Sequence, residues 1–320
     1  MYFLRRLLFA VPLLLFISLL AFGLLRLAPG GPFDRERAPA SPEIERNLAE
    51  KYHLQEPFLK QYLRYLGVGW ERDEQGRRKW FTGGLIRGDL GPSYRYRNHS
   101  VNDLIAAGLP VSMSLGLLAF TFALGVGLPL GFVTAVRRGE WVDYAGSFVA
   151  LLLVCVPGLV LAPLLIVVFA VRHHWFPVAL WTSPAHAVLP TVALGLYFSG
   201  RVARLMREGL LAVLRAEFLT TARAKGLGET AAVLKHGLRL AILPVVSYAG
   251  PLLADLLTGS FVIESVFQIP GLGVPMVNSS LNRDYTLVVG LVLLYAALLV
   301  GLNLVVDVVY RFLDPRVRYE

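Results

Sequence analysis

Six long apolar runs limit this chain to folds that bury such runs in a membrane. A helix that crosses a bilayer needs about 20 mostly apolar residues. Composition agrees, because 56% of the 320 residues are hydrophobic and only 17% are charged, whereas a typical globular chain has roughly a quarter charged residues. We therefore predict an all-α polytopic membrane protein with six transmembrane helices, near 7–27, 112–136, 142–171, 188–206, 242–262 and 286–308.

The runs also divide the chain into segments. We expect a first transmembrane helix in 1–28, an extracytoplasmic loop in 29–100, a transmembrane core in 101–310 and a tail in 311–320. The fourth run is the weakest, because Arg201 and Arg204 interrupt it and must lie at the interface or extend toward it. Pro157 and Pro163 fall inside the third run, where neighbouring helices can satisfy the carbonyls that a proline leaves unpaired.

The distribution of basic residues predicts the orientation. With the N-terminus inside, the cytoplasmic segments carry fifteen Lys and Arg residues, whereas the short outside loops carry only Arg172 and Arg283. Both termini are therefore expected in the cytoplasm. The first run is longer than the apolar part of a secretory signal, and no A-x-A cleavage site follows it. The single cysteine, Cys155, excludes an intrachain disulfide.

The outside loop has its own helical signals. Ser41 before Pro42, followed by Glu43 and Glu45, is typical of a helix start in 41–52. Residues 57–66 space their aromatic side chains three and four apart, which predicts an amphipathic helix. This pattern leaves open whether that helix packs on the outer rim or docks a partner. We expect short helices in this loop.

The inside loop at 201–239 is the most informative segment. It carries eight basic residues against three glutamates. Residues 217–224 (EFLTTARA) predict a short helix that Lys225 and Gly226 end, and a second helix follows over 229–240. Two short helices that meet at a glycine below the membrane form a protrusion that would fit a groove on a cytoplasmic partner.

Sequence motifs for catalysis are absent. None of the five lysines lies in a G-x-x-x-x-G-K-[ST] loop, and H-E-x-x-H, C-x-x-C and G-x-S-x-G do not occur. We therefore assign no catalytic, cofactor-binding or metal-binding residues and do not expect an enzyme. If ATP powers the protein, the nucleotide must bind another chain.

Residues 221–226 (TARAKG), with His236, Leu243 and Pro244 downstream, resemble the EAA cytoplasmic loop of ABC-importer permeases, in the form found in peptide transporters. The Glu-Ala-Ala of the general motif falls on Thr220, Thr221 and Ala222. Further stretches resemble markers of the same oligopeptide and dipeptide branch, in order: 1–32, 88–93 (GDLGPS), 263–273 (IESVFQIPGLG), 282–285 (NRDY), 303–307 (NLVVD) and 314–318 (DPRVR). The outside loop 172–187 is shorter than in some dipeptide permeases.

This resemblance implies a type I ABC import permease of the OppB/DppB-like kind in a bacterial or archaeal cytoplasmic (inner) membrane. It implies four kinds of partner: the lipid bilayer, a homologous second permease, two ABC ATPase subunits that hold ATP and Mg, and an extracytoplasmic peptide-binding protein. No nucleic acid is implied. Within the coupling loop 207–240, the implied ATPase contacts are Glu217, Thr220, Thr221, Ala222, Arg223, Ala224, Lys225, Gly226 and Leu227.

Two carboxylates are candidates for the translocation pathway. Asp255 falls inside the fifth run, where an ionisable residue is by default a functional candidate. Glu264 is expected at the outer end of the same span, near water, and the family motif around it suggests a role in closing the outer gate. Two alternatives remain at this point: the same machinery importing nickel or another small solute, and a self-sufficient secondary transporter or channel.

Overall fold

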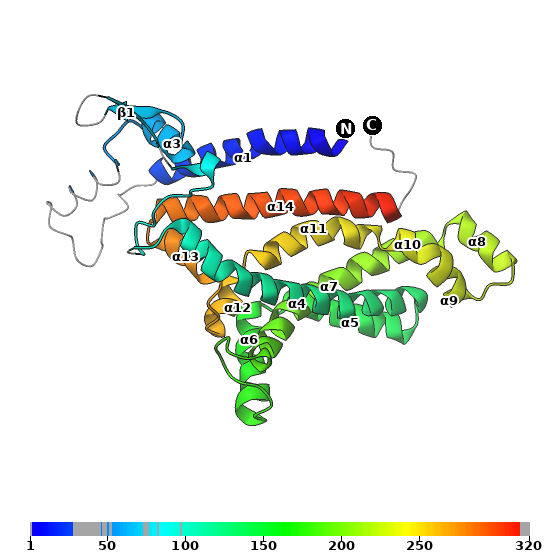
Figure 1. The fold of residues 1–320 in the computed structure, drawn as a ribbon. Coiled ribbons are helices and arrows are strands. Elements are labelled where there is room, and N and C mark those ends of the chain that lie inside the picture. Colours follow the sequence, from blue (N-terminus) through cyan, green and yellow to red (C-terminus); the bar gives the residue numbers. More distant parts are fainter. Residues whose placement is uncertain are drawn as a thin grey trace. The chain divides into compact units, whose positions relative to one another are not determined.

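A computed structural model describes residues 2–27, 46, 50, 53–72, 77–81, 83–96 and 98–313, and helices dominate it (Figure 1). The long helices are α1 (Tyr2–Leu27), α4 (Val101–Val136), α7 (Pro184–Leu214) and α14 (Tyr285–Leu313). The shorter helices are α3 (Phe58–Leu66), α5 (Trp141–Cys155), α6 (Gly158–Leu165), α8 (Glu217–Ala224), α9 (Glu229–Ala232), α10 (Leu238–Ala241), α11 (Leu243–Leu257), α12 (Phe261–Val266) and α13 (Gly273–Leu281). A 3-10 turn covers Leu85–Arg87, and π-helical segments cover Ile166–Arg172 and Val233–Gly237.

Four helical segments of the described chain are long and apolar enough to cross a membrane. They are Leu8–Leu27, Val101–Val136, Leu243–Val266 and Tyr285–Leu313. A fifth is obtained if Trp141–Cys155 and Gly158–Arg172 count together. The prediction of a helical, multi-pass membrane protein is confirmed at this level.

The third predicted span is not one continuous helix. Its two halves meet at an angle of 99°. Pro157 has no N–H to donate and disfavours the helical conformation for the residue before it, and Val156 is indeed extended, with ψ 116°. The prediction of a single helix over 142–171 is therefore wrong, because the chain forms two helices that are separated at Pro157 instead of one helix that accommodates this proline.

The chain forms two compact units, which we describe separately: unit 1 (1–6, 109–274 and 298–320) and unit 2 (7–108 and 275–297). In unit 2, Tyr62 and Tyr65 of α3 are buried around Phe22 of α1, and the Tyr62 hydroxyl lies 2.8 Å from the Ser18 hydroxyl. The amphipathic face of α3 is therefore used for packing within the chain. Most of the predicted helix 41–52 lies outside the described residues.

Unit 2 also contains two features that we did not predict. β1 (Trp70–Arg72) and β2 (Arg78–Trp80) pair in antiparallel register, so the loop contains a short hairpin as well as helices. The fully buried Asp284 accepts hydrogen bonds from the Ser93 hydroxyl and the Tyr94 N–H, the latter at 3.1 Å. The GDLGPS and NRDY stretches thus meet at one carboxylate.

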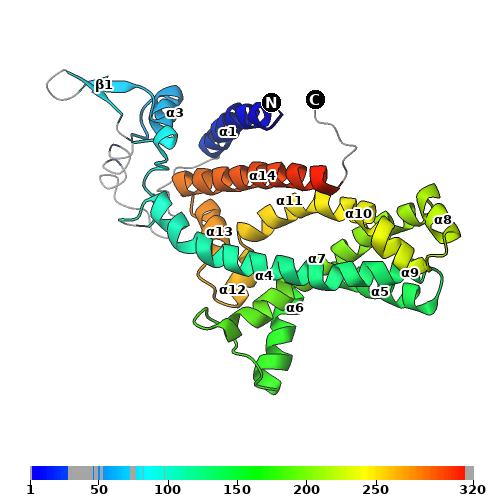
Figure 2. The ribbon, with the colours of Figure 1, turned by 45° about the vertical axis from the view of Figure 1, so that its right-hand side comes forward.

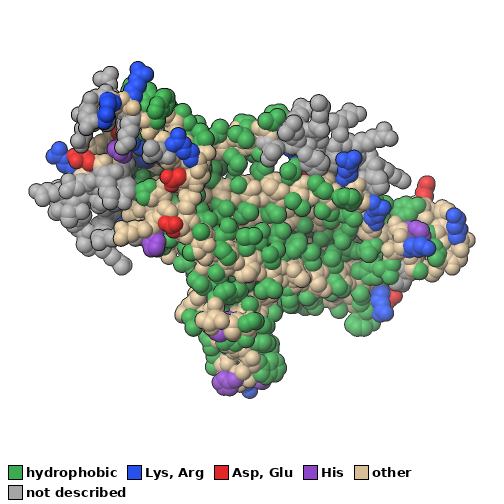
Figure 3. All heavy atoms as spheres, in the orientation of Figure 1, with side chains coloured by type: hydrophobic (Ala, Val, Ile, Leu, Met, Phe, Trp, Pro, Cys, Tyr) green, Lys and Arg blue, Asp and Glu red, His purple; other side chains and the backbone are tan. Residues whose placement is uncertain are grey.

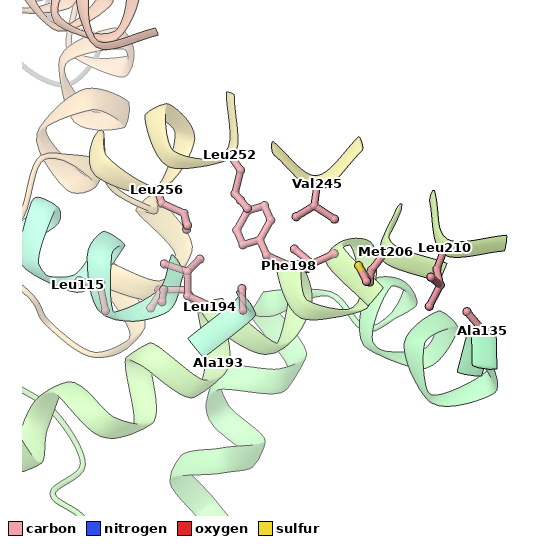
Figure 4. Close-up of a cluster of buried hydrophobic side chains, with 14 of the residues drawn as sticks. Leu115, Ala135, Ala193, Leu194, Phe198, Met206, Leu210, Val245, Leu252 and Leu256 are labelled. Carbon is pink, nitrogen blue, oxygen red and sulfur yellow. The ribbon is translucent and has the colours of Figure 1, made fainter. Parts of the chain in front are cut away.

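In unit 1, α7 is the central helix, packed against α4, α5 and α11. Figure 4 shows Leu194 and Phe198 of α7 directed into a cluster with Leu115, Leu252 and Leu256. Close approach depends on glycine, because a Cβ on Gly127 of α4 would lie 2.7 Å from the Ser199 carbonyl oxygen. In Figures 1 and 2, α8 and α9 form the end of this unit beyond α5 and α10.

Candidate functional site

The candidate coupling helix α8 is fixed to unit 1 by its inner face. Leu219 is fully buried and Ala222 nearly so, within the main hydrophobic core. Gly237 lets the following helical segment approach, since a Cβ there would already lie 3.6 Å from Leu219 Cδ1 and 3.1 Å from Val213 Cγ1. These apolar contacts hold α8 against the C-terminal end of α7 and the Val233–Gly237 segment.

The residues that follow α8 in the sequence determine where this helix ends. Gly226 adopts φ +86°, in the left-handed region that favours glycine. The Gly226 N–H donates to the Arg223 carbonyl (2.9 Å) and the Leu227 N–H to the Ala222 carbonyl (3.3 Å), which is the Schellman pattern of helix termination. Leu227 then packs against the core. The predicted stop at Lys225-Gly226 is confirmed.

The outward face of α8 is free for contact with another molecule. Most of the predicted coupling residues lie there and are exposed: Glu217, Thr220, Thr221, Ala224, Lys225 and Gly226. Arg223 is half-buried and donates to the Leu214 carbonyl at 3.4 Å. The segment therefore has two parts, an anchoring set of Leu219, Ala222, Arg223 and Leu227 and an exposed set.

The exposed set includes one residue that the sequence prediction left out. Phe218 is 40% exposed beside Glu217. Phe218 precedes the buried Ala222 by four residues, so it lies at the border of the buried face and remains partly exposed there. An exposed aromatic side chain on a charged protrusion is a typical anchor for a protein partner. Charged side chains of unit 1 gather around α8 and α9, whereas the α4–α11 face is almost entirely apolar (Figure 3).

A second unpredicted feature holds α5 to α7. Arg207 makes two hydrogen bonds of 2.9 Å to the two carboxylate oxygens of Asp143, whose side chain is 7% exposed. The Gly139 N–H also donates to Asp143, at 3.0 Å. Such a bidentate pair fixes the relative orientation of the two side chains as well as the distance between them. The partners are 64 positions apart in the sequence, which explains why no local pattern revealed the pair.

Glu264 lies inside unit 1, and the expectation that it is near water is wrong. Its side chain is fully buried. One carboxylate oxygen accepts from the Ser112 hydroxyl (2.8 Å), and the other accepts from the Gly273 N–H (2.7 Å). The Ser112 oxygen in turn accepts from the Leu272 N–H at 2.8 Å. Glu264 therefore connects α12, the 271–273 turn and α4.

Glycines make room for this carboxylate. A Cβ on Gly271 would lie 2.6 Å from Glu264 Oε2, and one on Gly273 would lie 2.9 Å from the same atom. The IPGLG stretch thus wraps around a buried acid. The pathway role of Glu264 stays a prediction, and this geometry favours a structural role.

Asp255 has the opposite environment. It is exposed on α11, and its carboxylate makes no hydrogen bond or ion pair with any residue that the structure describes. It does not share the partners of Glu264. The two candidate carboxylates therefore do not form one site.

Comparison with known proteins agrees with this arrangement. A family model described as binding-protein-dependent transport system inner membrane component matches residues 127–319. The oligopeptide transport system permease protein OppB of Haemophilus influenzae is 42% identical over 98% of this chain and 98% of its own length. The corresponding protein of Escherichia coli strain K12 is 41% identical over 99% of both chains.

Two further matches extend the comparison. The dipeptide transport system permease protein DppB of Bacillus subtilis is 40% identical over 95% of this chain and 94% of its own. Among solved structures, a chain of the inward-facing MetNI methionine ABC transporter aligns with a TM-score of 0.52 at 21% identity, covering 64% of this chain and 96% of that one. The last match concerns the fold of the aligned part.

Proposed function

Because this chain belongs to the family of binding-protein-dependent transport system inner membrane components, we propose that it is a permease subunit of an ATP-driven ABC importer for peptides. The observation that carries this proposal is α8, which is anchored by Leu219 and exposes its outer face. A second support is the end-to-end similarity of the chain to permeases named for oligopeptide and dipeptide transport. The chain is a transport subunit, not an enzyme.

Its partners follow from this role. A homologous second permease completes the pathway, two ABC ATPases bind ATP and Mg, and an extracytoplasmic binding protein delivers the peptide. The exposed residues of α8 dock on one ATPase. The anchoring set then passes the movement of that ATPase to α7, and the Asp143–Arg207 pair passes it to α5.

We place six spans in the membrane with both termini inside. The bent pair α5–α6 is one of them, and α7 is another although it carries Arg201, Arg204 and Arg207. The many buried residues of α7 support its assignment as a span, since a helix surrounded by other helices need not be apolar on every side.

Cysteine labelling tests this topology. In a Cys155→Ser background, Leu59→Cys in α3 should react with a membrane-impermeant thiol reagent in intact cells. Ala224→Cys in α8 should react only after the membrane is opened. Both positions are exposed, so access to solvent within the chain is matched. Labelling of Ala224→Cys in intact cells would contradict the topology.

Transport by the complete complex in proteoliposomes tests the function. The ATPases face the vesicle lumen, and ATP is enclosed there with them. With the binding protein outside, we expect the vesicles to accumulate a labelled tripeptide, and this uptake should depend on the binding protein. Nickel ions should not accumulate under the same conditions. ATP-dependent accumulation of nickel alone would favour the small-solute alternative, and peptide accumulation without ATPases would favour a secondary transporter.

A further inference from the structure

Ionisable side chains lie on an exposed face of α7 and α11. Arg201 and Arg204 are exposed on α7, and Asp255 is exposed on α11 on the same side as Pro251, one turn away. Arg201 lies seventeen residues after the first residue of a 31-residue helix, so it is near the middle and far from either end. Charged groups at that depth are costly in lipid and require water or a charged partner.

Tyr248 connects the two charges. The Arg201 guanidinium lies over the Tyr248 ring, with Cζ 5.2 Å from the ring centroid. Tyr197 precedes Arg201 by four residues on α7, and Asp255 follows Tyr248 by seven residues on α11, so the members of each pair share one face of their helix. A cation, two phenol hydroxyls and a carboxylate therefore share one region within unit 1.

The spacing of the charges is informative. Tyr248 and Asp255 are seven residues apart on one helix, which corresponds to two turns and about 10 Å along the axis. The Arg201 guanidinium lies over the Tyr248 ring, at the Tyr248 end of this two-turn stretch of α11, and Asp255 lies at its other end. An extended tripeptide spans about 10 Å at roughly 3.3–3.6 Å per residue. It has a carboxylate at one end and an ammonium group at the other.

We propose that Arg201 and Asp255 form a binding site in the pathway for the two termini of a peptide, with Arg201 holding the carboxylate and Asp255 the ammonium group. This inference rests on the proposed function and specifies its substrate chemistry as peptides with free termini. The guanidinium offers paired donors to a carboxylate, and the hydroxyls of Tyr197 and Tyr248 offer neutral hydrogen bonds to the peptide backbone between the ends.

Peptides with blocked ends test each half of the site. Three probes are compared in proteoliposomes with the complete complex: trialanine, its N-acetyl form and its C-terminal amide. Asp255→Asn should lower trialanine uptake about tenfold, equal to about 1.4 kcal/mol, and leave the slower N-acetyl uptake unchanged. Arg201→Gln should lower trialanine uptake to the same degree and leave uptake of the amide unchanged. The binding protein is the same throughout, so its own preference cancels in these comparisons.

The matched control is Arg204→Gln, which removes an exposed charge from the same helix one turn away and should change none of the rates. If Asp255→Asn and Arg201→Gln lower all three rates equally, or release the second permease during purification, the charges have a structural or interface role and the proposal is overturned. Unchanged trialanine uptake in both variants also overturns it. A wild-type complex that takes up none of the peptides contradicts the proposed function itself.

A second measurement does not depend on transport by these variants. In the Cys155→Ser background, Pro251→Cys between Tyr248 and Asp255 should react with a water-soluble thiol reagent, and trialanine should slow the reaction. Val149→Cys, on an exposed apolar position of α5, should not be protected. Failure of Pro251→Cys to react, or reaction that trialanine does not slow, overturns the proposal.

Discussion

Replacing Phe218 with alanine should separate this chain from its ATPases. Phe218 is an aromatic side chain of α8 that is 40% exposed and does not belong to the hydrophobic core that Leu219 and Ala222 enter. Aromatic anchors at the centre of an interface typically contribute about 2 kcal/mol or more, which exceeds a tenfold change in affinity. We therefore expect at least about tenfold less ATPase to co-purify with Phe218→Ala, and ATP-driven uptake to fall with it.

Two companion variants define what this result means. Phe312→Ala removes another exposed phenylalanine, at the C-terminal end of α14 (73% exposed), and should leave ATPase binding within about twofold of wild type. Leu219→Ala should lose the ATPases for a different reason, because removing a fully buried leucine costs about 2–5 kcal/mol and loosens α8 itself. Full ATPase recovery and normal uptake by Phe218→Ala would contradict the docking role of α8.

Replacing Glu264 with alanine should destabilise the chain more than most single substitutions. The Gly273 N–H and the Ser112 hydroxyl both lose a buried acceptor, and each unsatisfied buried group costs roughly 1–3 kcal/mol. A total of about 3 kcal/mol should lower the midpoint of thermal unfolding of the purified complex by about 5–10 °C. Glu264→Gln, which keeps the shape and one carbonyl acceptor, should lower it less.

The matched control is Asp255→Ala. Asp255 is also a carboxylate of the 243–266 segment, but it is exposed and makes no hydrogen bond or ion pair with the described part of the chain. Its removal should leave the unfolding midpoint unchanged. If Glu264→Ala unfolds at the wild-type temperature and instead changes only uptake, Glu264 belongs to the pathway, and our structural interpretation is wrong.

Local patterns predicted most of the elements that are determined locally. Apolar runs predicted the long helices, and the Lys225-Gly226 pair predicted the end of α8, because a left-handed glycine terminates a helix whatever lies around it. The start of α4 had a local signal that we overlooked. Ser100 and Asp103 satisfy each other's backbone N–H groups, at 3.1 Å and 2.9 Å, as a capping box does. This places the start of α4 at Val101 rather than near 112.

The errors concern contacts between distant parts of the sequence. Nothing in the third run distinguishes a tolerated proline from the 99° break at Pro157, since the residues on both sides of it are mostly apolar. A carboxylate at the end of a span is usually solvated, and Glu264 is buried only because Ser112, 152 residues earlier, lies against it. The sequence alone identified Asp255 as a pathway candidate, because it is a carboxylate inside an apolar run. Its proximity to Arg201 could not be predicted, because it depends on how α7 packs on α11.

Purification of this chain from its native cell in mild detergent tests the central claim most directly. Our account predicts that mass spectrometry of the purified material will find two P-loop ATPases and a second multi-span permease, and that the ATPases will be lost with Phe218→Ala. A chain that is recovered alone or as a homo-oligomer, even after crosslinking in the membrane, would contradict the account and favour a self-sufficient transporter.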